Sequence, residues 1–277
     1  MSLKTFGQLL LEAELDQACA VECGAGEAAW FALGSPDKQT VNEDALALFD
    51  LGAGRCVLAL ADGMGGHTAG EKAAARALQA LGAELSGAES AAARPGEDEP
   101  ALADAILAGF DAANRAVLAE LPGSGATLVA AEIDGNRCRI YHAGDSGALL
   151  IGGRGRLLRE TIPHSPVGFA VEAGVLEPEE ALHHGDRHLV SNVIGSETLH
   201  VGVSTTIRLK ARDVLLLASD GLFDNLRSAE IAALVPRGRL TSKLDRIAAA
   251  VHERMVTEVE DQPSKPDDLG LLAFRHG

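Results

Sequence analysis

The chain has 277 residues, of which 47% are hydrophobic and only 3% aromatic, so its core must be built from alanine, valine, leucine and isoleucine. Its formal net charge of −16 argues against nucleic-acid binding, because phosphate backbones would be repelled, but it is compatible with several divalent cations. Four cysteines without a C-x-x-C pair suggest a reducing compartment. The N-terminus lacks the order of a signal peptide and no apolar stretch approaches a membrane span, so we expect a soluble, cytoplasmic protein without membrane contact.

Short strands and two long helices are expected in the N-terminal half. Residues 1–24 predict a helical N-terminal extension. Strands follow at 28–34, 42–49 and 56–62, and the third is apolar throughout, which is typical of a central strand. Thr68 and Glu71 have the spacing of a capping box, so a helix should run from there to about residue 85. A polar linker at 86–98 then leads to a second amphipathic helix over about 99–121, packed antiparallel to the first.

The second half is richer in strands. Those at 126–133 and 137–143 flank Asp134-Gly135, a strong hairpin signal, and segments at 147–152 and 156–161 continue an antiparallel meander. An irregular stretch at 162–200 precedes strands at 201–209 and 214–219, helices at about 228–235 and 241–259, and a closing strand at 269–274. Because strands do not alternate one-for-one with helices, the pattern favours an α+β sandwich of antiparallel sheets over a parallel doubly wound sheet.

Acidic residues recur where a predicted strand meets a loop. Any one Asp-Gly pair is more often a turn than a metal ligand, but the set favours chemistry, because carboxylates that converge stay ionised only if their charge is cancelled. Hard cations such as Mg²⁺ and Mn²⁺ prefer oxygen ligands. The acids are Glu43 and Asp44 before one strand, Asp62-Gly63 and Asp220-Gly221 after two apolar strands, Asp145 in a turn, and Asp267 and Asp268 before the last strand.

The same residues carry a resemblance to a known family. The motifs NED at 42–44, DGMGGH at 62–67, GDS at 144–146, ASDGLFD at 218–224 and DD at 267–268 occur in the order found in the PPM family. These enzymes are metal-dependent serine/threonine phosphatases, also called protein phosphatase 2C-like, and the methionine in DGMGGH is typical of bacterial members. The likeness runs from about residue 28 to 274.

The resemblance implies a four-layer αββα sandwich, in which helices flank two antiparallel sheets and a metal centre lies at one edge. It also implies a single phosphatase domain over residues 25–277, with a flap segment at about 164–196. A hydroxide that bridges two Mn²⁺ or Mg²⁺ ions would attack the phosphorus of phosphoserine or phosphothreonine in a protein, without a covalent phosphoenzyme.

Each site residue takes a role by its position in the family motifs. By resemblance, Asp62 bridges the two ions, Glu43 and the carbonyl of Gly63 complete one of them, and Asp220 and Asp267 complete the other. Asp44 would hydrogen-bond metal-bound water, so Asp62 and Asp44 are the expected catalytic residues. Asp145 with Asp220 would hold the third ion found in many bacterial relatives.

Departures from the family pattern leave alternatives open. Gln39 stands where many members carry a phosphate-gripping arginine, and Lys38 beside it supplies a positive charge without the bidentate fork. Spacing favours Asp267 over its competitor Asp268 as the ligand. None of the core metal carboxylates is lost, so an active enzyme is favoured over a non-catalytic, metal-binding regulator that recognises a phosphoprotein.

Two further expectations concern chemistry and partners. The GDSG segment at 144–147 makes a serine hydrolase using Ser146 a remote alternative. His67 is read as a capping or packing residue rather than a general acid. We expect a monomer whose partners are phosphorylated proteins, the substrates of a cognate serine/threonine kinase.

Overall fold

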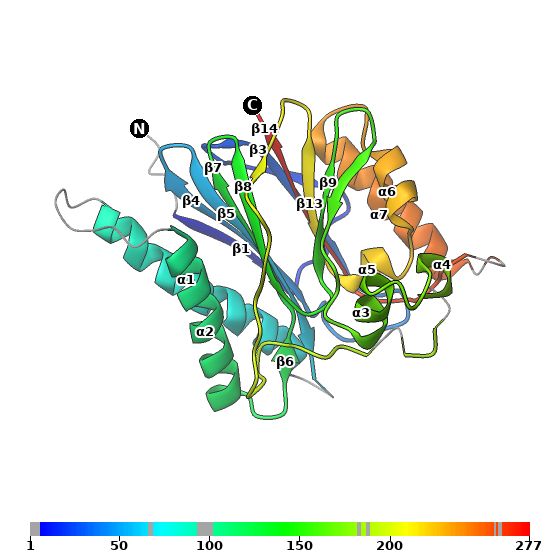
Figure 1. Ribbon diagram of the computed structural model, residues 1–277, viewed down its shortest axis with the longest axis horizontal. Helices are drawn as coiled ribbons and strands as arrows, with labels where there is room; N and C mark the ends of the chain where they lie inside the picture. The colour runs from blue at the N-terminus through cyan, green and yellow to red at the C-terminus, as the bar shows by residue number, and fades with distance from the viewer. Residues whose placement is uncertain are drawn as a thin grey trace.

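The structure is a computed structural model that describes residues 6–65, 69–92, 102–181, 184–186, 189–257, 259 and 262–277. Two antiparallel sheets form its centre (Figure 1). The first sheet has the strand order β1 (Gly7–Leu11), β4 (Asp44–Gly52), β5 (Arg55–Met64), β7 (Leu128–Asp134), β8 (Arg137–Ala143) and β11 (Gly202–Val203), with β6 (Gly125–Ala126) beside β5 and β12 (Ile207–Arg208) beside β8. The second has the order β10 (Leu157–Glu160), β9 (Gly147–Ile151), β13 (Val214–Ala218), β14 (Leu269–His276), β3 (Gly26–Leu33) and β2 (Cys19–Val21).

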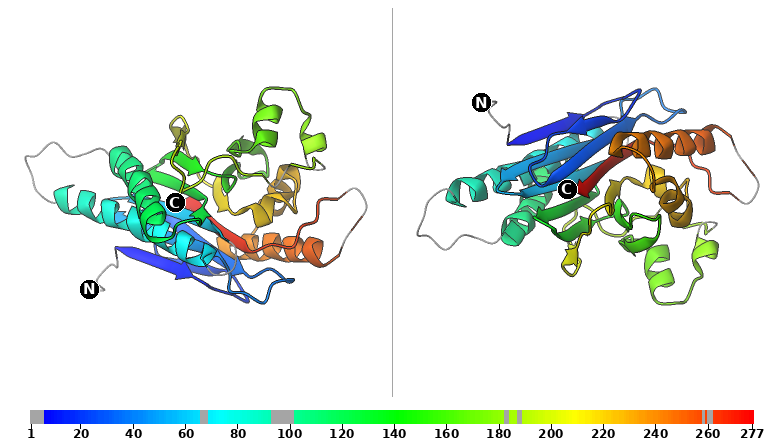
Figure 2. Two further views of the ribbon diagram at one scale, coloured as in Figure 1. Left: turned by 90° about the horizontal axis from the view of Figure 1, so that it is seen from below. Right: turned by 90° about the horizontal axis from the view of Figure 1, so that it is seen from above.

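Helices cover the outer face of each sheet, as Figures 1 and 2 show. The first sheet is covered by α1 (Gly70–Ala92) and α2 (Leu102–Glu120), and the second by α5 (Asp220–Phe223), α6 (Ser228–Leu234) and α7 (Leu240–Val256). Two short helices, α3 (Pro166–Glu172) and α4 (Pro178–Ala181), lie in the segment between β10 and β11. The predicted four-layer αββα sandwich is confirmed. Within the described ranges, no helix combines the length and apolarity needed to cross a bilayer.

Strand β5 explains why an apolar run was needed at the centre of the molecule. Its side chains alternate: Val57, Ala59 and Ala61 face α1 and α2, whereas Cys56, Leu58 and Leu60 face the second sheet. Successive side chains of a strand point to opposite faces. A strand that is covered on both faces must therefore be apolar at every position, as the sequence of β5 is.

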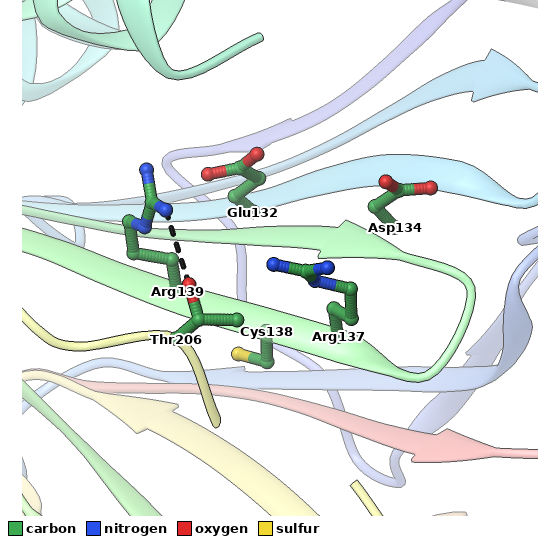
Figure 3. Close-up of a pocket in the computed structure, with 6 residues that line it drawn as sticks. All are labelled: Glu132, Asp134, Arg137, Cys138, Arg139 and Thr206. Atoms are coloured by element: carbon green, nitrogen blue, oxygen red, sulfur yellow. Dashed lines mark hydrogen bonds between the residues drawn. The ribbon is translucent and has the colours of Figure 1, made fainter. Parts of the chain in front are cut away.

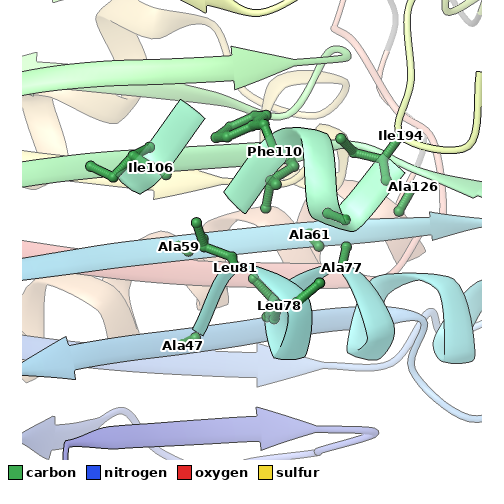
Figure 4. Packing of buried hydrophobic residues seen from close by; sticks show 14 of the residues in the cluster. Ala47, Ala59, Ala61, Ala77, Leu78, Leu81, Ile106, Phe110, Ala126 and Ile194 are labelled. Atoms are coloured by element: carbon green, nitrogen blue, oxygen red, sulfur yellow. The ribbon is translucent and has the colours of Figure 1, made fainter. Parts of the chain in front are cut away.

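Alanine allows the helices to approach the first sheet closely. Ala59 and Ala61 of β5 and Ala73 and Ala77 of α1 are fully buried, and larger side chains such as Phe110 of α2 fill the remaining space (Figure 4). Such close packing transmits the position of α1 to the strand beneath it. The few aromatic residues are spread over the layers, and the single tryptophan, Trp30 of β3, packs against the core between the sheets.

The prediction of a helical N-terminal extension is wrong for the residues that the structure describes. Residues Gly7–Leu11 form β1, which pairs with β4, and Cys19–Val21 form β2, which pairs with β3. A short apolar run interrupted by acids fits one face of a helix and an edge strand equally well, so only the tertiary pairing decides between them.

Two other local predictions also need correction. The helix α1 extends to Ala92, into the stretch predicted as a linker. The predicted meander is split, because β7 and β8 belong to the first sheet while β9 and β10 belong to the second. The chain therefore changes sheets at the turn 144–146. The proposed cap Thr68, like His67, lies outside the described residues.

Candidate metal centre

One end of the sandwich gathers the acidic residues from both sheets. Asp44 is the first residue of β4 and lies opposite Asp62 in the antiparallel register of β4 and β5. Asp220 begins α5 directly after β13, Asp267 precedes β14, and Asp145 lies in the turn where the chain changes sheets. Burial and the charges of these four neighbours raise the pKa of Asp62 well above its usual range. The predicted convergence of carboxylates therefore occurs in the fold.

Asp62 does not end its strand, as the sequence suggested. β5 continues through Gly63 to Met64, because β6 pairs with these two residues. The Asp62 amide donates to Thr127 Oγ1 at 3.1 Å, and the Thr127 amide donates to the carbonyl of Asp62 at 2.8 Å. Thr127 thus fixes the backbone that carries the Asp62 carboxylate through both its side chain and its main chain.

The two carboxylate oxygens of Asp44 differ in their hydrogen bonding. Only 2% of the residue is exposed. Ser219 Oγ donates to its Oδ2 at 2.6 Å, whereas Oδ1 is buried without a hydrogen-bond partner in the described part of the chain. Burial is the largest cause that raises the pKa of this carboxyl. A buried acceptor without a partner is costly unless water or a cation reaches it.

The carboxylate of Glu43 and the carbonyl of Gly63 lie close to the start of α1. The Gly63 amide donates to the Glu43 carbonyl at 3.2 Å. A Cβ atom placed on Gly70 would lie 2.2 Å from Glu43 Oε1 and 2.9 Å from the Gly63 carbonyl oxygen. Both oxygens therefore border one small region, where a side chain at position 70 would have no room. Glycine at Gly63 is required too, since a Cβ there would lie 2.0 Å from the Gly70 carbonyl oxygen.

A lysine that the sequence reading passed over is at the centre of the other acids. Lys265 Nζ lies 2.8 Å from Asp220 Oδ2, 2.8 Å from Asp224 Oδ2 and 3.0 Å from Asp267 Oδ2. Even so, burial and the charges of Asp145 and Asp267 raise the pKa of Asp220 to about 8. One ammonium group does not balance this concentration of negative charge.

Lys38 holds a second ammonium group among the acids. Its Nζ lies 2.9 Å from Glu43 Oε2, 3.2 Å from Asp268 Oδ2 and 3.7 Å from Asp267 Oδ1. Asp267 therefore lies between the two lysines. Gln39, the neighbour of Lys38, is exposed.

The adjacent acids Asp267 and Asp268 have different surroundings. Asp268 is buried, and its carboxylate accepts the amides of Ser35 at 2.8 Å and Glu43 at 2.9 Å. It ties the loop at 35–43 to the start of β14. Asp267 is less buried and contacts only the two lysines and the amide of Asp268 through its side chain, within the described residues.

The donor set fits hard divalent cations in type and charge. All of its members are carboxylate or carbonyl oxygens. Burial and neighbouring carboxylates raise the pKa values of Asp62 and Asp220, and Asp44 Oδ1 lacks a hydrogen-bond partner among the described residues. Their present geometry is not that of a formed metal site, because no three His, Cys, Asp or Glu side chains of the described chain are arranged to hold an ion. Glu43, Asp220 and Asp267 contact the two lysines instead, so an ion held by these carboxylates would compete with an ammonium group.

The signal that could have identified Lys265 is its position two residues before Asp267, in the segment that leads into β14. An ammonium group so close in sequence to two adjacent carboxylates is expected to pair with one of them. Asp224 was already part of the ASDGLFD motif. It caps the C-terminus of α5 four residues after Asp220, and the carboxylates of both residues contact Lys265.

Ser146 does not have the surroundings of a nucleophile. It is fully buried, and its Oγ lies 2.6 Å from Thr127 Oγ1. Because Thr127 also holds the Asp62 amide, this pair of hydroxyls connects the turn at 144–146 with β5. The serine-hydrolase alternative has no support in this arrangement.

A polar pocket of about 300 Å³ lies at the other end of the first sheet (Figure 3). It is lined by Glu132, Asp134, Arg137, Cys138, Arg139 and Thr206. Asp134 pairs with Arg55 at the start of β5, whereas the acids gather where β5 ends. The pocket is therefore separate from the candidate metal centre.

Known proteins resemble this chain in sequence and in structure. The family model described as protein phosphatase 2C matches residues 36–261. Serine/threonine protein phosphatase PstP of Mycobacterium tuberculosis is 39% identical over 179 residues, which cover 62% of this chain but only 32% of that protein, about a third of its length. Protein phosphatase PhpP of Streptococcus pneumoniae is 32% identical over 206 residues, covering 72% of this chain and 80% of that protein. The solved catalytic domain of PstP in complex with two manganese ions superposes with a TM-score of 0.67 at 30% identity, covering 90% of this chain and 98% of that one.

Proposed function

The chain belongs to the protein phosphatase 2C family, and on that premise we propose that it hydrolyses phosphoserine and phosphothreonine in proteins with the help of Mn²⁺ or Mg²⁺. One observation carries the proposal: carboxylates from both sheets and three loops meet at one end of the sandwich with more negative charge than the nearby lysines balance. The relatives named as serine/threonine phosphatases support the choice of substrate.

We assign two ion positions to the residues at this end. Glu43, Asp62 and the carbonyl of Gly63 would hold one ion, and Asp62, Asp220 and Asp267 would hold the other. Asp267 is preferred to Asp268 because the Asp268 carboxylate is already occupied by two backbone amides. Asp145 and Asp220 are the candidates for a third ion, which would compete with Lys265 for the Asp220 carboxylate.

Bound cations supply two things to this reaction, the activation of water and the neutralisation of charge on the phosphoryl group. The chain provides the positioning. Asp44 is fixed through Oδ2 by Ser219, so its free Oδ1 can accept a proton from the attacking water or orient that water by a hydrogen bond. Lys38 is the nearest exposed cation to these acids and would bind a phosphate oxygen as a point charge, with Gln39 as a neighbouring amide donor.

The wider assignment rests on these roles. We propose one phosphatase domain that includes β1 and β2, because these strands pair within its two sheets, with the segment at about 164–196 as its flap. Phosphoproteins made by a cognate serine/threonine kinase would be the substrates of a monomeric enzyme. A cytoplasmic location is supported by the four free cysteines, which fit a reducing compartment.

A direct assay tests the proposal. p-Nitrophenyl phosphate and a phosphothreonine peptide should be hydrolysed with Mn²⁺ and not with EDTA. Asp62→Asn should lose at least about 100-fold in turnover, as expected when a group that stabilises the transition state is removed. Asp134→Asn is the matched control, because this hairpin acid lies at the other end of the sheet.

The non-catalytic regulator remains the second outcome of the same experiment. Tight binding of the phosphopeptide in calorimetry, together with no turnover at any Mn²⁺ concentration, would overturn the enzymatic proposal in its favour. Turnover that persists in EDTA would contradict both readings.

A further inference from the structure

Two thiols face each other at the end of the sandwich that lies away from the acids. Cys23 lies in the turn between β2 and β3, in the second sheet, and Cys56 is the second residue of β5, in the first sheet. Their Sγ atoms are 3.0 Å apart, although the residues are 33 positions apart in sequence. The pair therefore connects the two sheets across the inner core.

The two sulfur atoms differ in access to solvent. Cys56 is fully buried in the cluster between the sheets, whereas Cys23 is half-buried and packs against the edge of that cluster. Cys19 is exposed in β2, and its thiol contacts the carbonyl of Gln17. Cys138 lies on β8, two strands away from Cys56, which places it about 10 Å from that residue. Of the four cysteines, Cys23 and Cys56 are the two whose sulfur atoms lie in contact in the described structure.

The electrostatics give the pair a preferred order of reaction. The hydrogen bond between the two sulfur atoms is the largest cause that lowers the pKa of Cys23. The same contact and burial raise the pKa of Cys56. The half-exposed sulfur is thus the more acidic one, and a thiolate is the reactive form of cysteine.

We propose that Cys23 and Cys56 are a peroxide-responsive dithiol that closes to a disulfide between the two sheets. The Cys23 thiolate attacks one oxygen of hydrogen peroxide, the O–O bond breaks, and sulfenic acid and hydroxide form. Cys56 then attacks the Cys23 sulfur as its proton is transferred, an S–S bond replaces the S–O bond, and water leaves. In sum, two thiols and one peroxide give one disulfide and two waters, and a small thiol reductant reverses the change.

The position of the two cysteines determines how a disulfide between them would affect stability and activity. The Sγ atoms need to approach by about 1 Å to reach bonding distance, which the turn carrying Cys23 can supply. Cys56 and Asp62 are six residues apart on β5, a span of about 20 Å in a strand. Closure therefore ties the sheets together without touching the acids, and it should raise the melting temperature while leaving metal-dependent turnover unchanged.

Peptide mapping of the full chain tests the proposal. The reduced protein is exposed to hydrogen peroxide, free thiols are alkylated, and the chain is cut by trypsin and a glutamyl endopeptidase. These enzymes separate Cys19 in peptide 15–22 from Cys23 in peptide 23–27 and Cys56 in peptide 56–71. We expect peptides 23–27 and 56–71 to be cross-linked, with Cys19 and Cys138 alkylated, and dithiothreitol to release the link.

Variants provide the control and the stability readout. Cys23→Ser is a change in a half-exposed turn and should abolish the link, whereas Cys19→Ser should retain it. Oxidation should raise the melting temperature of the wild type by roughly 5–15 °C and that of Cys23→Ser not at all. Cys56 that remains fully alkylated after peroxide, or that is linked to Cys19 or Cys138, would overturn the proposal. These outcomes are independent of phosphatase activity, so they distinguish a failure here from a failure of the proposed function.

Discussion

Replacement of Asp62 by asparagine should stabilise the metal-free protein while it removes the response to Mn²⁺. Asp44 and Asp62 are direct cross-strand partners, so their Cβ atoms lie about 5 Å apart. Two like charges at that distance repel each other by about 3 kcal/mol at an effective dielectric constant of 20. Solvent screening of the half-buried Asp62 and its partial protonation reduce this, so the expected gain is about 1–2 kcal/mol, or roughly 2–8 °C in melting temperature.

Thermal unfolding of wild type and Asp62→Asn, each with EDTA and with Mn²⁺, measures both effects. Mn²⁺ should raise the melting temperature of the wild type and leave that of the variant nearly unchanged, because binding to the folded state alone stabilises it. Asp134→Asn should behave like the wild type in both conditions. The reasoning is refuted if Asp62→Asn melts below the wild type in EDTA, or if Mn²⁺ raises the melting temperature of both proteins equally.

Three further changes test the same end of the sandwich. Burial raises the pKa of Asp220 to about 8, so this group destabilises the metal-free fold progressively as pH rises from about 4 to 8. In urea unfolding, Asp220→Asn should be more stable than the wild type, and this gain should be larger at pH 8 than at pH 5. Burial lowers the pKa of His164 to about 4, which gives the opposite pH trend, but this contribution is the same in both proteins and cancels when their free energies of unfolding are subtracted. Lys265→Met leaves Asp220 and Asp224 without their cation and Asp267 with Lys38 alone. It should cost about 2–4 kcal/mol of the free energy of unfolding without metal, while calorimetry should show Mn²⁺ binding several-fold tighter. Unchanged affinity for Mn²⁺ would contradict the proposed competition between Lys265 and the ion. Gly63→Ala should lower the free energy of unfolding in urea by about 2–4 kcal/mol, because the added Cβ would lie 2.0 Å from the Gly70 carbonyl oxygen. If the variant is instead as stable as the wild type, the start of α1 can shift to make room for the methyl group.

Sequence patterns predicted correctly those elements whose burial restricts the residues that they can contain. The strand β5 is apolar on both faces because both faces are covered. Asp44 and Asp62 could be placed at the same end of the sheet, because antiparallel pairing of β4 with β5 brings the start of one strand opposite the end of the other. Strands at the edge of a sheet are not covered in this way, so their sequences are less restricted. β1 and β2 were read as a helix because their pairing with β4 and β3 depends on residues far along the chain.

The charge balance of the site could not be read from the sequence. Motifs pointed to the acids, and the position of Lys265 two residues before Asp267 signalled that one contact but not its contacts with Asp220 and Asp224. Lys265 lies 45 residues from Asp220, and the structure alone brings its ammonium group to that carboxylate. The change of sheet at residues 144–146 was missed for a similar reason, since a Gly-Asp-Ser turn looks locally like any connection between paired strands.

The single tryptophan gives this molecule a built-in optical reporter. Trp30 pairs with Leu272 on one side and with Cys19 on the other, and its indole packs against the core between the sheets. All tryptophan emission therefore comes from one site that loses its packing when the sheets separate. Separation of the two sheets can be followed by fluorescence without a label, while a change confined to the pair of helices over the first sheet would leave that signal unaltered.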